Sequence, residues 1–503
     1  MAKFEIKDGV AIIPEGTIEI GGRAFFGCTS LESITIPESV KVIGWSAFKG
    51  CTSLKSITIP DSVTEIKENA FSGCASLESI TIPDSVTRIG LYAFEGCTSL
   101  KSIVIPKLVT DDISTVFRGC ASLESIVVAE DNPRYDSREG CNAIIETETN
   151  TLICGCKSTI IPESVTKIAE RAFARCTSLE SIINPESVTE IGERTFKGCT
   201  LLESITIPES VTKIGEWAFE NCTSLKSITI PESVKVIEWN AFSGCASLES
   251  IVVAEDNPRY DSREGCNAII ETETNTLICG CKSTIIPESV KVVGRGTFKG
   301  CTSLKNISIP ESVTKIKEHA FRACTSLESI IIPKSVTEIG WYAFEGCTSL
   351  KSVAIPESVT EIGGWAFAYC TSLESITLPE SVKVIEWNAF GGCTSLKSIT
   401  LPESVTEIRL SAFGGCTSLE SIVIPKGVTK IWGGTFEGCT SLTTVTLPVG
   451  VKKIEDDVFN KCSALATIYV PAKKADYYKK RFHEVFHDII VELAPEKKTK
   501  TKK

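Results

Sequence analysis

The sequence from Cys28 to Gly50 reads Cys-Thr-Ser-Leu-Glu-Ser-Ile-Thr-Ile-Pro-Glu-Ser-Val-Lys-Val-Ile-Gly-Trp-Ser-Ala-Phe-Lys-Gly, and a close copy begins at Cys51. A repeat period between 20 and 50 residues is typical of solenoids, in which each repeat forms one coil. Seventeen of the 23 cysteines keep a spacing of 23 residues within three runs, which are Cys28 to Cys120, Cys176 to Cys245 and Cys301 to Cys462. The prolines of the same register, with Ala129 and Ala254 at the proline slot, indicate 20 coils.

The first half of each repeat predicts a short strand. Leu31, Ile34 and Ile36 follow the spacing L-x-x-I-x-I, which places apolar side chains on one side of an extended segment. Pro37 ends the strand because proline has no backbone N–H to donate to a sheet. Since no coil can bury its apolar side alone, neighbouring coils must stabilise one another.

The second half of each repeat returns to the core. Val40 and Ile43 are expected to point inward on the return path, and Ala47 and Phe48 to close the coil in a short helical turn. Phenylalanine occupies this closing slot in 17 coils, from Phe25 to Phe459, which predicts one continuous file of stacked rings.

Composition narrows the functional classes. The chain has 503 residues, 42% of them hydrophobic, so it can bury a sizeable core. Its net charge of −11 argues against a general nucleic-acid binder, and its apolar runs are far shorter than the ~20 residues of a membrane span. The first residues show no apolar stretch of signal-peptide length, which favours a cytoplasmic location, with the cell surface as the alternative.

The repeat pattern C-x-x-L-x-x-I-x-I-P-x-x-V-x-x-I-x-x-x-A-F resembles that of the BspA-like, or Treponema pallidum-type, leucine-rich repeat family. The resemblance covers nearly the whole chain. It implies an α/β leucine-rich-repeat solenoid, right-handed, of about 20 coils of 23 residues, with a parallel β-sheet on the concave face. It also implies a role in binding or adhesion, which in this family is typically found in bacterial surface proteins and proteins of parasitic protists.

Two inserts interrupt the repeats. Residues 127–165 and 252–290 are identical in sequence, and each holds two apolar runs around a polar turn. This pattern predicts protruding β-hairpins, at residues 130–162 and 255–287.

The two ends of the chain are expected to cap the solenoid, because exposed terminal coils would leave apolar surface in water. Residues 1–27 are expected to form an N-terminal capping coil, and residues 28–471 the solenoid itself. Residues 472–494 are expected to form a C-terminal cap, and residues 495–503 a basic disordered tail. Within the C-terminal cap, residues 472–487 are typical of an amphipathic helix that covers the open core with four aromatic residues, Tyr477, Tyr478, Phe482 and Phe486.

One literal catalytic motif is present. His483, Glu484 and His487 match H-E-x-x-H, in which two histidines on one helical face bind zinc and the glutamate acts as base. A third ligand is required, and no histidine follows His487. We therefore expect no catalytic centre, no metal and no cofactor. A zinc hydrolase stays as a remote alternative, and surface zinc binding without catalysis as another.

The cysteines allow several interpretations. A cysteine that recurs once per coil at one slot is expected to be a small buried hydrophobic residue, although neighbours in the stack could come close enough to bridge. The insert cysteines, Cys141, Cys154 and Cys156 with their copies Cys266, Cys279 and Cys281, could form a hairpin disulfide, a three-thiolate metal site or buried thiols. Buried thiols are favoured.

Charges and aromatic residues form rows along the stack. The position after the leading leucine alternates from Glu32 to Lys55 to Glu78 to Lys101, which predicts a ladder of weak ion pairs. The residue after each proline is usually acidic, which predicts either a solvated rim or a ridge that steers a basic partner. The candidate interaction patch is aromatic and consists of Trp341, Tyr342, Trp365, Trp387, Trp217 and Trp239, with packing between coils as the other interpretation.

These patterns together predict a non-enzymatic protein-binding or scaffolding protein with a protein partner. A cell-surface adhesin of the resembled family is the alternative.

Overall fold

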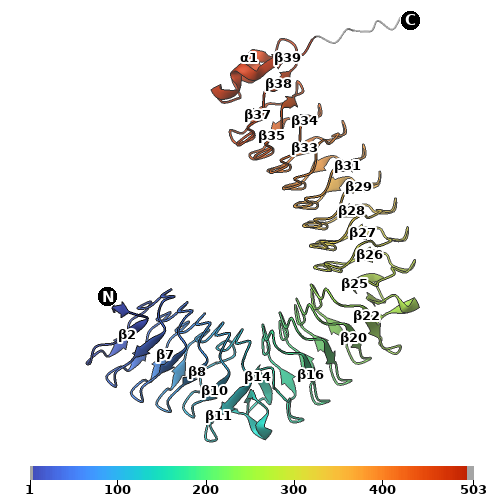
Figure 1. Cartoon of the computed structure of the whole chain (residues 1–503). Helices are drawn as coiled ribbons and strands as arrows, with labels where there is room; N and C mark the ends of the chain where they lie inside the picture. The colour runs from blue at the N-terminus through green and yellow to red at the C-terminus, as the bar shows by residue number, and fades with distance from the viewer. Residues whose placement is uncertain (1–3, 495–503) are drawn as a thin grey trace, which may run out of the picture. The chain divides into compact units, whose positions relative to one another are not determined.

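The computed structural model describes residues 4–494 and divides the chain into two compact units, Met1–Pro258 and Arg259–Lys503 (Figure 1). The basic segment 495–503, predicted to be a tail, lies outside the described residues. Each unit is a β-solenoid of stacked coils, as the repeat predicts. No helix among the described residues has the length and apolar character needed to cross a bilayer.

Most of the leading strands contain the serine and isoleucine that follow the leading leucine. They pair in parallel and in register, for example Ser56 with Ser79 and Ile57 with Ile80, and the central residue of most of them is buried. In the first unit they are β2 (Val10–Ile12), β4 (Ser33–Thr35), β6 (Ser56–Thr58), β8 (Ser79–Thr81), β10 (Ser102–Ile105), β11 (Ser125–Val128), β16 (Ser181–Ile183), β18 (Ser204–Thr206), β20 (Ser227–Ile230) and β22 (Ser250–Val253). In the second unit they are β29 (Ser352–Ala354), β31 (Ser375–Thr377), β34 (Ser421–Val423), β36 (Thr444–Thr446) and β38 (Thr467–Val470).

The return path forms a second set of parallel ladders, each strand two residues long. In the first unit these strands are β3 (Glu19–Ile20), β5 (Val42–Ile43), β7 (Glu65–Ile66), β9 (Arg88–Ile89), β15 (Lys167–Ile168), β17 (Glu190–Ile191), β19 (Lys213–Ile214) and β21 (Val236–Ile237). In the second unit they are β26 (Val292–Val293), β27 (Lys315–Ile316), β28 (Glu338–Ile339), β30 (Glu361–Ile362), β32 (Val384–Ile385), β33 (Glu407–Ile408), β35 (Lys430–Ile431) and β37 (Lys453–Ile454).

The closing segment differs from the prediction. Ala47 and Phe48 lie in a run of turns rather than in a short helical turn. The reason is that the backbone bonds here alternate: the Ala47 N–H donates to the Gly44 carbonyl of its own coil at 3.2 Å, whereas the Phe48 N–H donates to the Ala70 carbonyl of the next coil at 2.7 Å. Helix is therefore nearly absent from this fold.

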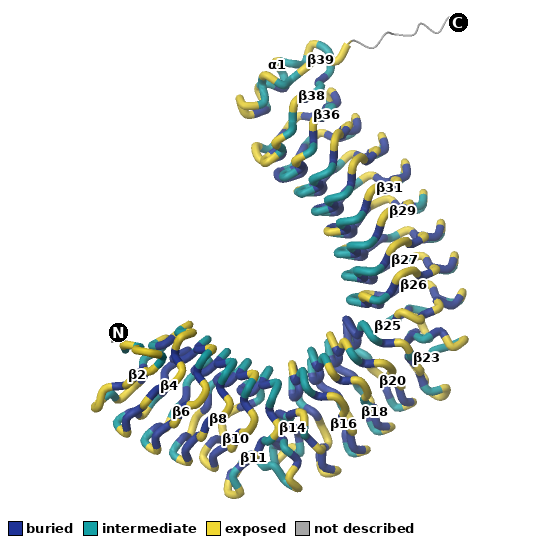
Figure 2. Tube along the Cα trace, viewed as in Figure 1, coloured by how far each residue is buried: buried dark blue, intermediate teal, exposed yellow. Residues whose placement is uncertain are grey.

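The apolar side chains of each coil fill the space between the two sets of strands, where the trace is buried (Figure 2). Phenylalanine rings stack coil on coil, with centroids 5.2 Å apart between Phe25 and Phe48 and 5.1 Å between Phe48 and Phe71. The predicted continuous file is wrong at the first insert. There Gly155 lies against Phe173, so closely that a Cβ at Gly155 would come within 2.1 Å of the ring.

The inserts form the predicted hairpins. In the first unit β13 (Ala143–Glu146) and β14 (Thr151–Gly155) are antiparallel, and β12 (Tyr135–Asp136) adds a third strand. The hairpin also belongs to the solenoid sheet, because β14 pairs in parallel with β15. The second unit repeats the arrangement with β23 (Tyr260–Asp261), β24 (Ala268–Glu271) and β25 (Thr276–Gly280). A short 3-10 helix precedes each hairpin, at Arg138–Gly140 and Arg263–Gly265.

Aromatic residues cover the core near both ends of the described chain. Phe4 stacks on Phe25 with 5.4 Å between centroids, before an antiparallel pair of β1 (Ile6–Lys7) and β2. At the other end Phe482 and Phe486 both contact Phe459.

The amphipathic helix expected over residues 472–487 is much shorter in the structure. α1 covers only Ala475–Lys479, and a 3-10 helix, η3, covers Glu484–Ile489 before β39 (Ile490–Glu492). The extended backbone of His483, with ψ of 147°, separates the two helices. The aromatic residues still reach the core, with Tyr478 and Phe482 buried and Tyr477 and Phe486 half-buried.

Candidate functional site

Four of the six predicted patch residues come together in the second unit. Trp341 and Tyr342 close one coil, Trp365 the next and Trp387 the one after it. We call these four residues the aromatic plate. Tyr342 stacks on Trp365 with 5.9 Å between centroids and an interplanar angle of 19°, whereas Trp341 meets Trp387 edge to face at 5.7 Å. The plate is therefore one continuous set of ring contacts across three coils.

The plate is exposed as well as packed. Trp341 and Trp387 expose 37% and 46% of their surface, and Tyr342 and Trp365 are half-buried. Trp341 reaches Trp387 by lying across Gly364, where a Cβ would come within 2.9 Å of the indole. Glycine at this position thus lets an indole of one coil contact an indole two coils further on.

Charged residues border the plate in pairs. The Arg322 guanidinium lies 5.7 Å from the Tyr342 ring and pairs with Glu345 at 2.6 Å. Arg409 lies 5.9 Å from the Trp387 ring and pairs with Glu386 at 2.7 Å. Arg409 pairs with a second carboxylate as well, that of Glu407 at 3.0 Å, so both guanidinium groups beside the plate have carboxylate partners.

Two groups beside the plate have shifted pKa values. Burial raises the pKa of Glu386, and the nearby Arg409 opposes this rise. Burial lowers the pKa of His319 to about 4, assisted by the positive charges of Arg322, Lys299 and Arg295. The neutral His319 ring stacks on Tyr342 with 4.8 Å between centroids, and so extends the plate by one coil.

The remaining two patch residues, Trp217 and Trp239, lie in the first unit. Their rings contact each other at 5.4 Å with an angle of 56°, and the Arg194 guanidinium lies 4.1 Å from the Trp217 ring. Both indoles are half-buried. They form a separate, smaller aromatic pair.

The H-E-x-x-H residues do not share a helical face. His483 is extended and precedes η3, and its Nδ1 accepts a hydrogen bond from the Val485 N–H at 3.4 Å. The His487 ring lies 3.2 Å from the Phe482 carbonyl. Among residues 4–494, no group of three histidine, cysteine or acidic side chains is arranged to hold a metal ion.

The cysteines are buried, as predicted, except that Cys28 and Cys462 are half-buried. Each thiol after the first of a run donates to a phenylalanine carbonyl in the core, for example Cys74 to Phe48 and Cys324 to Phe298, both at 3.1 Å. Burial raises the pKa of Cys51 to about 12. The insert thiols of Cys141 and Cys156 likewise bond to backbone carbonyls, of Ala143 and Asn142. These thiols therefore pack and donate within the core.

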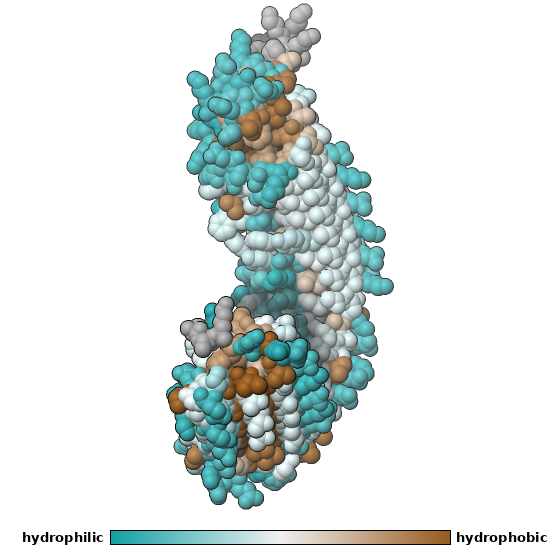
Figure 3. Space-filling model, turned by 60° about the vertical axis from the view of Figure 1, so that its left-hand side comes forward, coloured by the Kyte–Doolittle hydropathy of each residue, from teal (hydrophilic) through white to brown (hydrophobic). Residues whose placement is uncertain are grey.

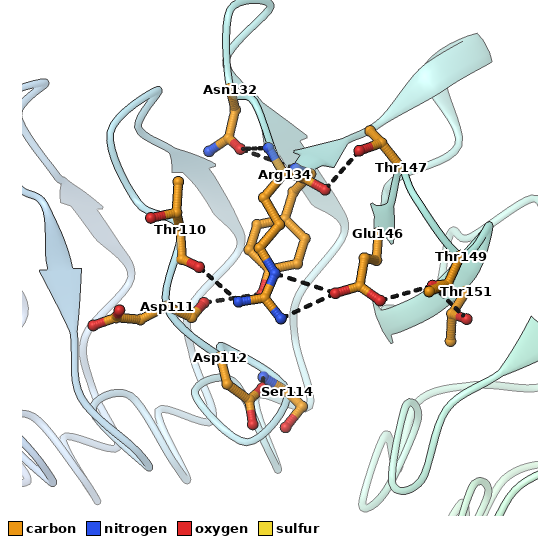
Figure 4. Close-up of polar contacts among 11 residues, drawn as sticks. Thr110, Asp111, Asp112, Ser114, Asn132, Arg134, Glu146, Thr147, Thr149 and Thr151 are labelled. Atoms are coloured by element: carbon orange, nitrogen blue, oxygen red, sulfur yellow. Dashed lines mark hydrogen bonds and ion pairs between the residues drawn. The ribbon is translucent and has the colours of Figure 1, made fainter.

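A polar network fastens the first hairpin to the solenoid (Figure 4). The buried Asn132 donates to the carbonyls of Pro106 and Val109, and its side-chain oxygen accepts from the backbone of Arg134 and Tyr135. Arg134 donates to the Thr110 carbonyl at 2.7 Å and to Glu146. Both polar atoms of the Asn132 side chain have partners, so this network is a structural lock.

The predicted charge ladder forms weak pairs. Glu78 and Lys101 approach to 3.0 Å and Glu203 and Lys226 to 2.6 Å, with side chains about 60% exposed. Lys157 continues the ladder through the insert by pairing with Glu124 at 2.6 Å. Exposed pairs of this kind contribute at most ~1 kcal/mol each.

The space-filling view shows apolar residues gathered near the C-terminal end of the described chain (Figure 3). Val423, Val449 and Leu493 are exposed there and line a groove of about 520 Å³. The coils of the second unit that precede this end present a surface of intermediate hydropathy on this face, white in Figure 3.

Sequence reasoning located the aromatic slots but missed their surroundings. Gly364, His319 and the two arginine–glutamate pairs beside the plate were not singled out. A glycine one coil away from a tryptophan in the same slot, as in Trp341 and Gly364, is the signal that could have revealed the crossing indole.

Comparison with known proteins gives a family match over most of the chain. The model of the BspA type leucine rich repeat region matches residues 13–138, 149–263, 274–393 and 361–485. No curated protein matches the chain.

Solved structures to which the chain is similar include bacterial leucine-rich repeat proteins. One from Bacteroides ovatus is 25% identical, with 96% of this chain and 92% of that chain covered and a TM-score of 0.34. A leucine rich cell surface protein from Faecalibacterium prausnitzii is 27% identical, with 94% of each chain covered and a TM-score of 0.34. A leucine-rich repeat protein from Eubacterium ventriosum is 21% identical, with 89% and 94% covered and a TM-score of 0.44.

Proposed function

Because the chain belongs to the BspA-type leucine-rich repeat family, we propose that it is a non-enzymatic protein-binding or scaffolding protein whose aromatic plate contacts a protein partner. The observation that carries this proposal is the contact between the exposed indoles of Trp341 and Trp387. Tryptophan, tyrosine and arginine are the residues that most often dominate the energy of protein interfaces, and this plate contains all three at its centre and border.

The charges around the plate favour an interface of this kind. An arginine whose charge is already balanced, as Arg409 is by Glu386, can donate further hydrogen bonds to a partner without leaving a net charge buried. The chain would then use an extended surface rather than an enclosed cavity. We assign no catalytic centre. The zinc-hydrolase alternative needs His483 and His487 on one helical face, whereas His483 is extended and precedes the helix that contains His487.

The test is a pull-down with the full chain and with the variant Trp341→Ala/Trp365→Ala/Trp387→Ala. A matched control is Trp432→Ala, which removes another half-buried tryptophan of the same unit. Each partner captured by the parent chain is then purified and titrated by calorimetry. We expect the triple variant to weaken binding by ~2 kcal/mol or more, and the control to bind as the parent does. A partner that binds all three chains equally would exclude the plate.

The same plate would serve a cytoplasmic scaffold or a cell-surface adhesin. Labelling live cells with a membrane-impermeant amine reagent separates the two, because only an exposed adhesin is labelled efficiently. Zinc analysis of the purified chain addresses the hydrolase alternative, which requires stoichiometric zinc that is lost in His487→Ala.

A further inference from the structure

A groove of about 570 Å³ lies on the first unit, where β7 and β9 meet the closing segments that follow them. Ile89 and Gly90 line it between two exposed apolar side chains, Trp45 and Leu91, which expose 46% and 44% of their surface. At Gly90 the backbone approaches Glu68 so closely that a Cβ would lie 2.4 Å from the Glu68 nitrogen. The groove therefore combines apolar walls with a glycine that packs directly against the backbone of the preceding coil.

The aromatic plate of the second unit shows what occupies the same place there. Trp45, Glu68 and Leu91 stand at the repeat positions that Trp341, Gly364 and Trp387 hold in the second unit. In the second unit the Trp341 indole crosses Gly364 and contacts Trp387. In the second unit, therefore, the space that corresponds to the groove is occupied by the Trp341 indole.

In the first unit the indole turns the other way. Trp45 lies against Gly22 of the preceding coil, where a Cβ would come within 2.3 Å of the indole nitrogen, and Arg23 lies 4.7 Å from its ring. Glu68 occupies the repeat position of Gly364, so its side chain stands in the path that the Trp341 indole takes in the second unit. Leu91 occupies the position of Trp387 and is shorter than a tryptophan. The groove is left open with a carboxylate between its apolar walls.

The charges lining the groove are unbalanced. Four acidic and two basic residues line it. Arg88 is held between Glu65 at 3.3 Å and Asp111 at 2.9 Å, and Lys67 pairs with Glu19 at 3.2 Å. Glu68 and Asp112 remain, and their side chains accept hydrogen bonds from neutral donors, the Asn69 amide and the Ser114 N–H. Asp112 also interacts electrostatically with Arg134, whose guanidinium pairs with Glu146 at 3.0 Å.

We propose that this groove binds the side chain of a lysine or arginine from a basic polypeptide segment. The aliphatic stem packs between Trp45 and Leu91, and the cationic group is received by the carboxylates of Glu68 and Asp112. Long basic side chains suit such a site because they bury an apolar stem while the charged end stays in water, and the indole face adds a cation–π attraction. The site lies in the first unit and does not depend on the aromatic plate.

The experiment uses the full chain labelled with 5-fluorotryptophan and observed by fluorine NMR. The Trp45→Phe variant assigns the Trp45 resonance. The probe is the end-blocked peptide Ala-Lys-Ala-Lys-Ala, and Ala-Glu-Ala-Glu-Ala is its acidic counterpart. We expect the basic peptide to shift the Trp45 resonance saturably, with an apparent Kd that rises with salt, and the acidic peptide to leave it unmoved.

The test of the carboxylates is the variant Glu68→Gln/Asp112→Asn, which keeps the shape of both side chains. It should raise the apparent Kd by about tenfold, as expected for the loss of two partly exposed ionic contacts. Glu38→Gln/Asp61→Asn removes the same charge from exposed positions that do not line the groove, and should change the Kd less than twofold. The proposal is overturned if the basic peptide does not move the Trp45 resonance, if both peptides move it alike, or if both double variants weaken binding equally.

Discussion

The Trp341 indole meets the Trp387 indole edge to face at 5.7 Å, although a whole coil lies between the two residues. The contact exists because Gly364 in the intervening coil has no side chain in the path of Trp341. A solenoid thus joins side chains that are far apart in sequence, and a single small residue decides whether they touch.

Substituting Gly364 tests this relationship without removing an aromatic ring. In Gly364→Ala the new Cβ would lie 2.9 Å from the Trp341 ring, so the indole must move off Trp387. We expect a changed near-ultraviolet circular dichroism spectrum, weaker partner binding, and a loss of stability below ~1 kcal/mol because a side chain rather than backbone gives way. Gly21→Ala is the control, since nothing lies within 4 Å of its Cβ position, and its spectrum should match the parent. Identical spectra for both variants would contradict the crossing indole.

The thiols should react in two classes. Burial raises the pKa of Cys51 to about 12 and of Cys462 to about 11, so the reactive thiolate is scarce at pH 8. Cys28 and Cys462 are the two half-buried thiols, and we expect them to be modified first by a disulfide reagent in the native protein. Mass spectrometry of peptides identifies the modified sites, and the chain in urea supplies the count for full reaction. Rapid native labelling of Cys324 or another buried thiol would show that the coils open.

Acid should destabilise the second unit through His319. Its folded pKa is lowered to about 4 from the ordinary 6.5, so between these values the unfolded state binds a proton that the folded state does not. Proton binding by the unfolded state therefore lowers the unfolding free energy as the pH falls from 6.5 toward 4, whereas above pH 6.5 His319 has no such effect. Urea unfolding at pH 7.5 and pH 5 should show a smaller loss in His319→Gln than in the parent. His483→Gln, at an exposed histidine, should follow the parent.

The sequence predicts the architecture well because each core slot recurs in every coil. Phe48 and Phe71 could be expected to stack because a parallel ladder places equal slots side by side. The same reasoning fails where a coil is unique. The insert has no phenylalanine in this slot, and the contact of Gly155 with Phe173 follows from how the hairpin re-enters the sheet.

The candidate site was less predictable, because the repeat fixes the slot of each tryptophan but not the direction in which its side chain points. Trp45 and Trp341 occupy equal slots, yet one lies toward Gly22 and the other toward Gly364. The direction of the indole depends on whether the preceding or the following coil carries a glycine in the same slot, so it is set by the residues of three successive coils. The spacing of His483 and His487 likewise suggested one helical face, but the extended backbone at His483 prevents it.

Asn132 should be essential to the first hairpin. Its amide donates to Pro106 and Val109 at 3.0 and 2.9 Å, and the Pro106 carbonyl also accepts from the Val109 N–H, so Asn132→Ala leaves the Val109 carbonyl without its donor in a buried place. The variant also removes the acceptor of the Arg134 and Tyr135 N–H groups. We expect a loss of about 2–4 kcal/mol in unfolding free energy and faster hydrogen exchange in β12 to β14. Asn460→Ala removes an exposed asparagine bonded to Glu437 and should cost less than ~0.5 kcal/mol. Equal losses in the two variants would refute the lock.

The pair of Arg409 and Glu386 should matter more than the ladder on the leading strands. Glu386 is only 3% exposed, and in Arg409→Met its carboxylate loses the cation that balances it. We expect the unfolding free energy at pH 7.5 to fall by about 2–3 kcal/mol, since breaking one side of a buried pair leaves an uncompensated charge. Lys101→Met breaks a pair with Glu78 in which both side chains are largely exposed, and should cost less than ~1 kcal/mol.

The pH dependence of that variant gives an independent check. Burial raises the pKa of Glu386, and removing Arg409 takes away the charge that opposes this rise. A carboxyl whose folded pKa is raised destabilises the fold as the pH increases past its unfolded pKa, so the deficit of Arg409→Met should shrink as the pH is lowered from 7.5 to 5. The double variant Arg409→Met/Glu386→Gln should recover most of the loss at pH 7.5. A deficit that is the same at both pH values would mean that lost packing of the Arg409 stem against Trp387, rather than charge, is the cause.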